Sequence, residues 1–172
     1  SGDNIKRDAI AAQFMATYTL PVLEKYKPVV SASYTHVSGD ANAAAHRDPG
    51  GSAGTKAASE DVYTAWDPFN ENQGGGTIYN TLFDLTNLNI VALGLQATPV
   101  QDVTASVVWS GLWLNKKVDG LNPLYFRQPD GIIAGTAFAG TTNGSKALGN
   151  EYDVNVNYAY TEDVTVGLSL GW

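Results

Sequence analysis

Apolar and polar residues alternate with a period of two along much of the chain, the pattern of β-strands with one apolar face. Six segments show it: residues 10–20, 30–35, 91–97, 103–113, 151–160 and 164–172. The segment 151–160 is the clearest, because Tyr152, Val154, Val156, Tyr158 and Tyr160 alternate with acidic residues and asparagines. The segment 91–97 is less regular, and no window shows a helical stripe. We therefore predict an all-β protein with about six strands.

The connections between these segments alternate between short and long. Short connections cover residues 21–28, 99–102 and 161–163, whereas long ones, rich in Gly, Asn, Asp and Ala, cover residues 39–76 and 115–150. Long loops without structure of their own are uncommon in compact soluble domains. Short turns at one end and long loops at the other are typical of outer-membrane barrels. We predict that residues 1–172 form a single unit of an antiparallel transmembrane β-barrel, with 39–76 and 115–150 as long extracellular loops.

The two faces of the predicted strands differ in composition. The apolar face carries Tyr and Trp near the strand ends, as expected of an aromatic girdle that faces lipid: Tyr18, Tyr34, Trp109, Trp113, Tyr152, Tyr160 and Trp172. A soluble β-sandwich or a lipocalin-like cup that binds a small ligand is the alternative, because such folds also alternate apolar and polar faces. A sandwich, however, is expected to build its core from Leu, Ile, Val and Phe and to expose Lys and Glu.

The opposite face is polar and mostly small, which suits a water-filled lumen. The predicted lumen-lining residues are Arg7, Gln13, Ser31, Ser33, Thr35, Asp84, Gln96, Thr104, Ser106, Ser110, Glu151, Asp153, Asn155 and Asn157. The simpler interpretation is that each of them only fills the polar face of an amphipathic sheet. In the second long loop, Lys116, Lys117 and Arg127 are candidates for a gate that folds inward.

Composition and charge narrow the function classes. The 172 residues carry a formal net charge of −7, which argues against a nucleic-acid partner. Cysteine is absent, so disulfides and thiolate chemistry are excluded, and no apolar run is long enough for a transmembrane helix. We predict no cofactor, no metal site and no enzymatic activity. The carboxylates of loop 39–76 would suit divalent ions, although ordinary solvation is the simpler interpretation.

Seven segments follow one another in a recognisable order and spacing: 34–40 (YTHVSGD), 65–73 (AWDPFNENQ), 77–90 (TIYNTLFDLTNLNI), 98–106 (TPVQDVTAS), 126–131 (FRQPDG), 148–153 (LGNEYD) and 158–164 (YAYTEDV). Together they resemble the C-terminal part of the alginate-export family of outer-membrane barrels. The resemblance implies a barrel of many more than six strands in a Gram-negative outer membrane. It also implies passage of an anionic polysaccharide such as alginate, or of other hydrophilic solutes, without catalysis, and contact with outer-membrane lipid and lipopolysaccharide.

The sequence departs from the family pattern in two respects. Six strands are too few to close a barrel, because the smallest have eight, so we expect a segment of a larger barrel or closure by homo-oligomerisation. If the short turns are periplasmic, the last strand also stops on the extracellular side. A polyuronate channel favours a basic constriction, whereas the fifth segment carries Glu151 and Asp153. A porin for other solutes, or an assembly module that self-associates through its sheet edges, therefore stays open.

Overall fold

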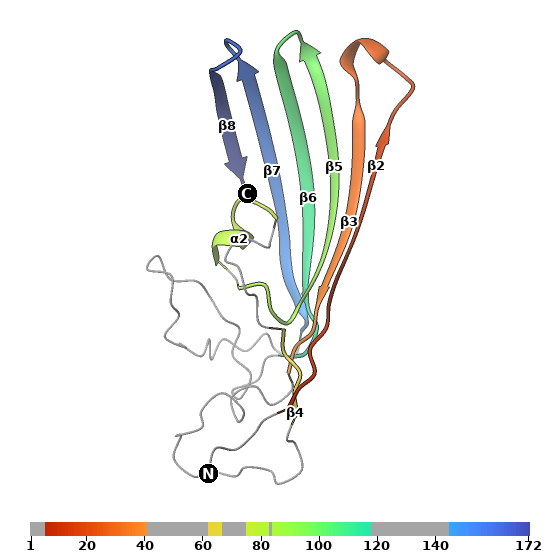
Figure 1. Cartoon of the computed structure of the whole chain (residues 1–172), viewed down its shortest axis with the longest axis vertical. Coiled ribbons are helices and arrows are strands. Elements are labelled where there is room, and N and C mark those ends of the chain that lie inside the picture. Colours follow the sequence, from red (N-terminus) through yellow and green to blue (C-terminus); the bar gives the residue numbers. More distant parts are fainter. Residues whose placement is uncertain (1–5, 41–61, 67–74, 83, 118–144) are drawn as a thin grey trace.

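The computed structural model describes residues 6–40, 62–66, 75–82, 84–117 and 145–172. Six strands form one antiparallel sheet in which neighbours along the chain pair in sequence order (Figure 1). The strands are β2 (Ala11–Thr19), β3 (Val29–Val37), β5 (Leu88–Val100), β6 (Val103–Leu114), β7 (Ala147–Ala159) and β8 (Thr165–Gly171). This confirms the prediction of an all-β, antiparallel fold. The third predicted strand is longer than expected, since β5 begins three residues earlier and continues to Val100.

The three short connections lie together at one end of the sheet (Figure 1). Strands β2 and β3 are joined through a short 3-10 turn, η1 (Glu24–Tyr26), and Leu20 donates its backbone N–H to the carbonyl of Pro28. A tight turn joins β5 to β6, with Asp102 in the left-handed region at φ 64°. In the turn from β7 to β8, the Thr161 hydroxyl accepts the backbone N–H of Val164 at 3.0 Å.

The strand register keeps the two predicted faces continuous from β2 to β8. Residues directly opposite each other on paired strands share a face. On one side, Phe14 lies opposite Tyr34, and Val154 lies opposite Leu170. On the other side, Gln13 lies opposite Thr35, and the Gln13 amide donates to the Thr35 hydroxyl at 2.9 Å. The alternation in the sequence therefore corresponds to one apolar face and one polar face of a single sheet.

The apolar face is open to its surroundings. Phe14 is 69% exposed and Leu168 is 58% exposed, although both project from the apolar side of the sheet. Within the described ranges, the strands form this one six-stranded sheet and a separate two-stranded pair, β1 (Lys6–Arg7) with β4 (Val62–Tyr63). A β-sandwich buries its apolar face against a second sheet. The exposed face therefore does not fit the sandwich alternative.

A small hydrophobic core lies on the other, polar face, near the end of the sheet that carries the long connections. It consists of Val37, Tyr79, Leu85, Leu88, Ile90, Leu112 and Leu114. Tyr79 belongs to the short helix α2 (Tyr79–Leu82), which precedes β5 and lies beside the sheet (Figure 1). The alternation predicted polar residues along this whole face, so these aliphatic side chains are a departure from the prediction. Among the described residues, no helix is long and apolar enough to cross a membrane.

Candidate functional site

Most of the predicted lumen residues come together on one face of the sheet, here called the hydroxylic face. Its members are Gln13, Ser31, Ser33, Thr35, Gln96, Thr104, Ser106, Ser110, Glu151, Asp153, Asn155 and Asn157. Ser169 on β8, which lies opposite Asn155, extends this face, and its hydroxyl donates to Asn155 Oδ1 at 2.6 Å. Such a surface offers hydroxyl and amide groups to water and to polar solutes. Its exposure to a lumen stays a prediction.

Two predicted lining residues lie elsewhere. Arg7 lies in β1, which pairs with β4 and stands apart from the six-stranded sheet, and Asp84 lies between α2 and β5. The first predicted strand begins at residue 10, and Arg7 precedes it in a two-residue bridge that leaves no periodic signal. Neither side chain is therefore placed on the strands that carry the hydroxylic face.

The proposed gate residues are only partly covered by the structure. Lys116 and Lys117 are exposed just after β6. The backbone of Lys116 is fixed by Asn87, whose Oδ1 accepts the Lys116 N–H and whose Nδ2 donates to the Lys116 carbonyl. Arg127 lies outside the described residues. A gating role for these side chains remains a prediction.

Charge is almost absent from the six strands of the sheet. Glu151 and Asp153 on β7 are the only Asp, Glu, Lys or Arg residues in them. Both side chains are buried, at 5% and 3% exposure. Buried carboxylates require partners, because removing a charge from water is costly. The partners come from the segment that contains α2.

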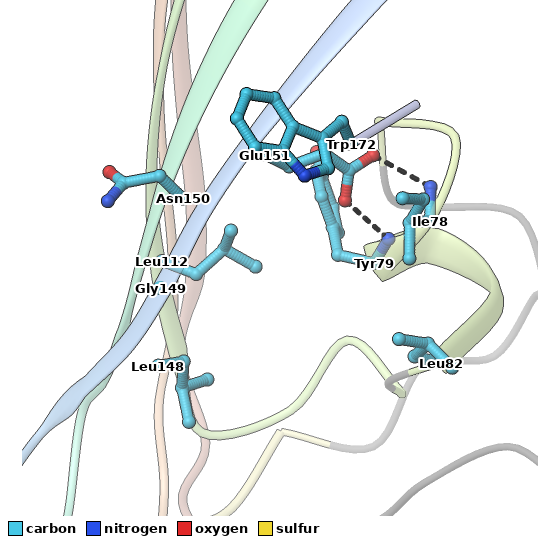
Figure 2. Close-up of a pocket in the computed structure, with 9 residues that line it drawn as sticks. All are labelled: Ile78, Tyr79, Leu82, Leu112, Leu148, Gly149, Asn150, Glu151 and Trp172. Atoms are coloured by element: carbon cyan, nitrogen blue, oxygen red, sulfur yellow. Dashed lines mark hydrogen bonds between the residues drawn. The ribbon is translucent and has the colours of Figure 1, made fainter. Parts of the chain in front are cut away.

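Residues 75–82 and 84–86, called the inner segment below, lie on the hydroxylic face and bind these carboxylates. The backbone N–H groups of Thr77 and Ile78 donate to Glu151 Oε1, and that of Tyr79 donates to Oε2, each at 2.7 Å. Figure 2 shows two of these bonds, to Ile78 and Tyr79. Thr77 N–H also donates to Asp153 Oδ1 at 3.2 Å, whereas Asp153 Oδ2 is buried and has no hydrogen-bond partner in the part of the chain that the structure describes.

Gly76 and Tyr79 shape the start of the inner segment. Gly76 has a φ of +85°, and a Cβ added there would lie 2.2 Å from the Tyr79 ring, so only glycine fits beneath the ring. Burial, reinforced by the nearby charge of Glu151, raises the pKa of Tyr79 from 10.0 to about 12. Tyr79 therefore stays neutral at physiological pH.

A pocket of about 190 Å³ opens between the inner segment and β7 (Figure 2). Most of its wall is apolar, formed by Ile78, Leu82, Leu112, Leu148 and Trp172, with the Glu151 carboxylate on one side. No nucleophile with an adjacent base lines it. Among the residues that the structure describes, no three His, Asp or Glu side chains form a group suited to a metal ion.

The aromatic residues of the apolar face lie in two zones. Near the long connections, Tyr34 Oη donates to Asn89 Oδ1 at 3.0 Å and Trp109 Nε1 donates to Asn150 Oδ1 at 3.1 Å. The polar ends of these rings are thus satisfied on an otherwise apolar face, a feature of interfacial aromatics. The alternation did not single out Asn89 or Asn150, because an isolated asparagine is an ordinary strand-end residue.

The remaining predicted girdle residues complete the two zones. Trp172, which follows β8 and also lines the pocket beside Glu151, has its ring centroid 6.2 Å from that of Tyr152, and Trp113 lies near the end of β6. Tyr160 lies at the turn end of the sheet, 6.2 Å from Tyr158, and Tyr18 lies near the turn end of β2. Tyr152 and Tyr160 are eight residues apart, or about 26 Å along an extended strand. A tilt of about 40° reduces this to roughly 20 Å, similar to the apolar band of about 25 Å in outer-membrane barrels.

A meander of antiparallel strands, apolar and exposed on one side and hydroxylic on the other, is the arrangement found in β-barrel membrane proteins. Comparison with protein families gives a match to the alginate-export family over residues 2–171, nearly the whole chain. The chain therefore belongs to the alginate-export family, and the resemblance found in the sequence is confirmed. No curated protein and no solved structure matched it.

Proposed function

We propose that the chain forms part of the wall of an outer-membrane channel through which hydrophilic solutes pass passively. In this proposal the hydroxylic face lines the lumen and the apolar face contacts lipid. The observation that carries it is the continuity of both faces across all six strands, with the apolar side chains exposed. Membership of the alginate-export family supports an export channel in the outer membrane of a Gram-negative bacterium.

The proposed mechanism needs no catalysis. Hydroxyl and amide groups along the lumen replace part of the hydration of a passing solute, which lowers the free energy of crossing. Sugar hydroxyls both donate and accept hydrogen bonds, as do Ser, Thr and Asn side chains. The hydroxylic face therefore suits a polysaccharide, and an anionic one such as alginate is the solute that the family suggests.

The sheet must be closed for this function. In the described residues, β2 and β8 each lack a strand on their outer side. Unpaired backbone groups are costly in hydrocarbon, so transmembrane sheets close on themselves. We propose that further strands complete the ring, supplied either by the same polypeptide or by additional copies of the chain.

Reconstitution of the full native polypeptide into planar lipid bilayers tests the proposal. We expect stepwise ion conductance, and we expect oligomers of alginate to interrupt the current more strongly than neutral oligosaccharides of equal length. Absence of conductance from correctly folded protein would refute the channel. Conductance that alginate does not affect would retain the channel and refute the anionic polysaccharide.

The free sheet edges also favour a second candidate, an assembly module that associates through β2 and β8. Such a module would form rings or arrays without conducting. Chemical cross-linking in detergent, compared with the bilayer recordings on the same preparation, separates the two. Stable arrays without conductance would support the assembly module.

A further inference from the structure

The inner segment covers the only two charged side chains in the strands of the sheet. Glu151 is 5% exposed and Asp153 is 3% exposed, and three backbone N–H groups of the segment end on the Glu151 carboxylate. The sequence alone indicated an acidic lumen at this point, which disfavours an anionic solute. In the structure, these carboxylates face the backbone of the inner segment and are almost inaccessible to solvent.

We propose that the inner segment is a fixed liner, latched by Glu151, that narrows the lumen and hides both carboxylates from passing solutes. This inference rests on the proposed function and deepens it, because it names the residue that sets the width and the ion selectivity of the channel. Glu151 is a positioning residue in this scheme. It acts through the inner segment and does not touch the solute.

The packing around the latch explains why the liner is fixed in place. Aliphatic side chains such as Leu88, Ile90 and Leu112 interrupt the hydroxylic face where Tyr79 and Leu85 of the inner segment cover them. Exposed to a water-filled lumen, these apolar groups would be unfavourable. The sheet therefore carries a built-in binding surface for the segment, and the hydrogen bonds to Glu151 fix its position on that surface.

Strand β8 provides the space that the liner needs. A Cβ added at Gly171 would lie 2.9 Å from Ile78 Cγ1 and 3.1 Å from Thr77 Cβ, so the inner segment lies directly against this strand. The same Cβ would lie 3.1 Å from Asp153 Oδ1, so the missing side chain also leaves room for that carboxylate. Gly171 thus allows the segment and Asp153 to share one narrow space.

Release of the liner would change the electrostatics of the lumen as well as its width. Among the described residues Asp153 Oδ2 has no hydrogen-bond partner, so departure of the segment would expose a carboxylate with one unbonded oxygen to solvent. Fixed negative charge in a narrow pore attracts cations and repels anions. Asp84 is the one charged residue of the liner itself and is present in both states, so the change on release comes from Asp153. Loss of the liner is therefore expected to make the channel more cation-selective.

Bilayer recordings on the full native polypeptide test this scheme with three variants. Glu151→Gln removes the negative charge and one acceptor oxygen, so the Tyr79 N–H loses its acceptor and the bonds that the remaining oxygen accepts from Thr77 and Ile78 are weakened. We expect a roughly twofold or greater rise in conductance, as for any widened pore, and a shift of the reversal potential toward cation selectivity. The double variant Glu151→Gln/Asp153→Asn should keep the higher conductance and lose the selectivity shift. Glu162→Gln, in the exposed turn after β7, is the charge-matched control and should behave as wild type.

A reversible disulfide tests whether movement of the segment causes these changes. The chain has no cysteine, and the hydroxyl oxygens of Thr77 and Ser169 lie 3.5 Å apart. We add Thr77→Cys and Ser169→Cys to the Glu151→Gln variant. Oxidation to the disulfide should restore wild-type conductance and selectivity, and reduction of the disulfide should bring back the conductance and selectivity of Glu151→Gln. Unchanged conductance and selectivity in Glu151→Gln, or a disulfide that forms without restoring them, would overturn the proposal.

Accessibility of Ser110 gives a readout that is independent of conduction. Ser110 is 1% exposed and lies directly opposite Glu151 on the neighbouring strand β7. A water-soluble thiol reagent should label the Ser110→Cys variant slowly, and at least about tenfold faster when Glu151→Gln is also present, because the latch governs the opening equilibrium. Equal labelling rates refute the latch even if the wild-type protein does not conduct. If the wild-type protein does not conduct but Glu151→Gln strongly accelerates labelling, the latch is supported and only the proposed channel function is refuted.

Discussion

Replacing Glu151 by alanine is the most direct test of how the inner segment is held. The variant removes both acceptor oxygens from the N–H groups of Thr77, Ile78 and Tyr79, and leaves the strand backbone unchanged. Thr77 is exposed, so water replaces its lost bond at little cost. Ile78 is partly buried and Tyr79 is buried, so their N–H groups are left wholly or partly unsatisfied.

The magnitude follows from these exposures. A buried donor that loses its acceptor costs about 1–3 kcal/mol, and bonds to charged groups lie at the upper end of that range. Counting the Tyr79 N–H fully and the Ile78 N–H in part, we expect the variant to lose about 2–4 kcal/mol of the free energy that keeps the segment docked. At about 1.36 kcal/mol per factor of ten, the opening equilibrium rises roughly 30- to 900-fold.

Amide hydrogen exchange measured by mass spectrometry on the full native polypeptide in detergent is the appropriate assay. Peptides that cover the start of the inner segment should exchange roughly 30- to 900-fold faster in Glu151→Ala than in the wild type, because local opening governs exchange there. Peptides from β6 should change little, and Glu162→Ala should leave both regions unchanged. Acceleration by less than about threefold in the inner segment would refute the latch as the dominant anchor.

Two further predictions concern Tyr79 and the apolar face. Because the pKa of Tyr79 is raised from 10.0 to about 12, the docked state keeps its proton at pH values where the released segment loses it. Docking is therefore fully stable below about pH 10 and weakens by about 1.4 kcal/mol per pH unit up to about pH 12. When tyrosinate absorbance is followed against pH, the wild type should show one group that titrates near pH 12 and that is missing in Tyr79→Phe. Identical titration curves for the wild type and the variant would contradict this. On β7, Val156→Lys should reduce folding in lipid vesicles by about 2–4 kcal/mol, whereas Asn155→Lys on the opposite face should cost much less. Equal costs would mean that the apolar face does not contact lipid.

The sequence was sufficient to predict the strands, because alternation is a local signal and each strand here has one strongly apolar face. The segment from Tyr152 to Tyr160 is the best example, and its predicted faces match the structure residue by residue. Turn composition also located the three hairpins. Directly paired residues share a face, so the hydroxylic face could be assembled from the alternation alone.

The inner segment could not be predicted in the same way, since it depends on contacts between residues more than seventy positions apart. Glu151 and Tyr79 show this clearly. The alternation placed Glu151 among the lumen-lining residues and gave no role to Tyr79, yet the Tyr79 N–H donates to the Glu151 carboxylate. A signal was nevertheless present just before the third segment, where Leu88 and Ile90 place aliphatic side chains on the polar face. Leu112 and Leu114 repeat that irregularity on the neighbouring strand. Two adjacent breaks in alternation at the same level of a sheet indicate that something covers it.

The directions of the two outermost strands restrict how the cylinder can be completed. Each of the five pairings from β2 to β8 is antiparallel, so β2 and β8 themselves run in opposite senses. If further strands connect the free edges of β2 and β8 in a fully antiparallel ring, their number must be even. If copies of the sheet instead join β8 of one copy to β2 of the next, no further strands are needed. The total is then even in every case, which is the parity of bacterial outer-membrane cylinders built from one polypeptide.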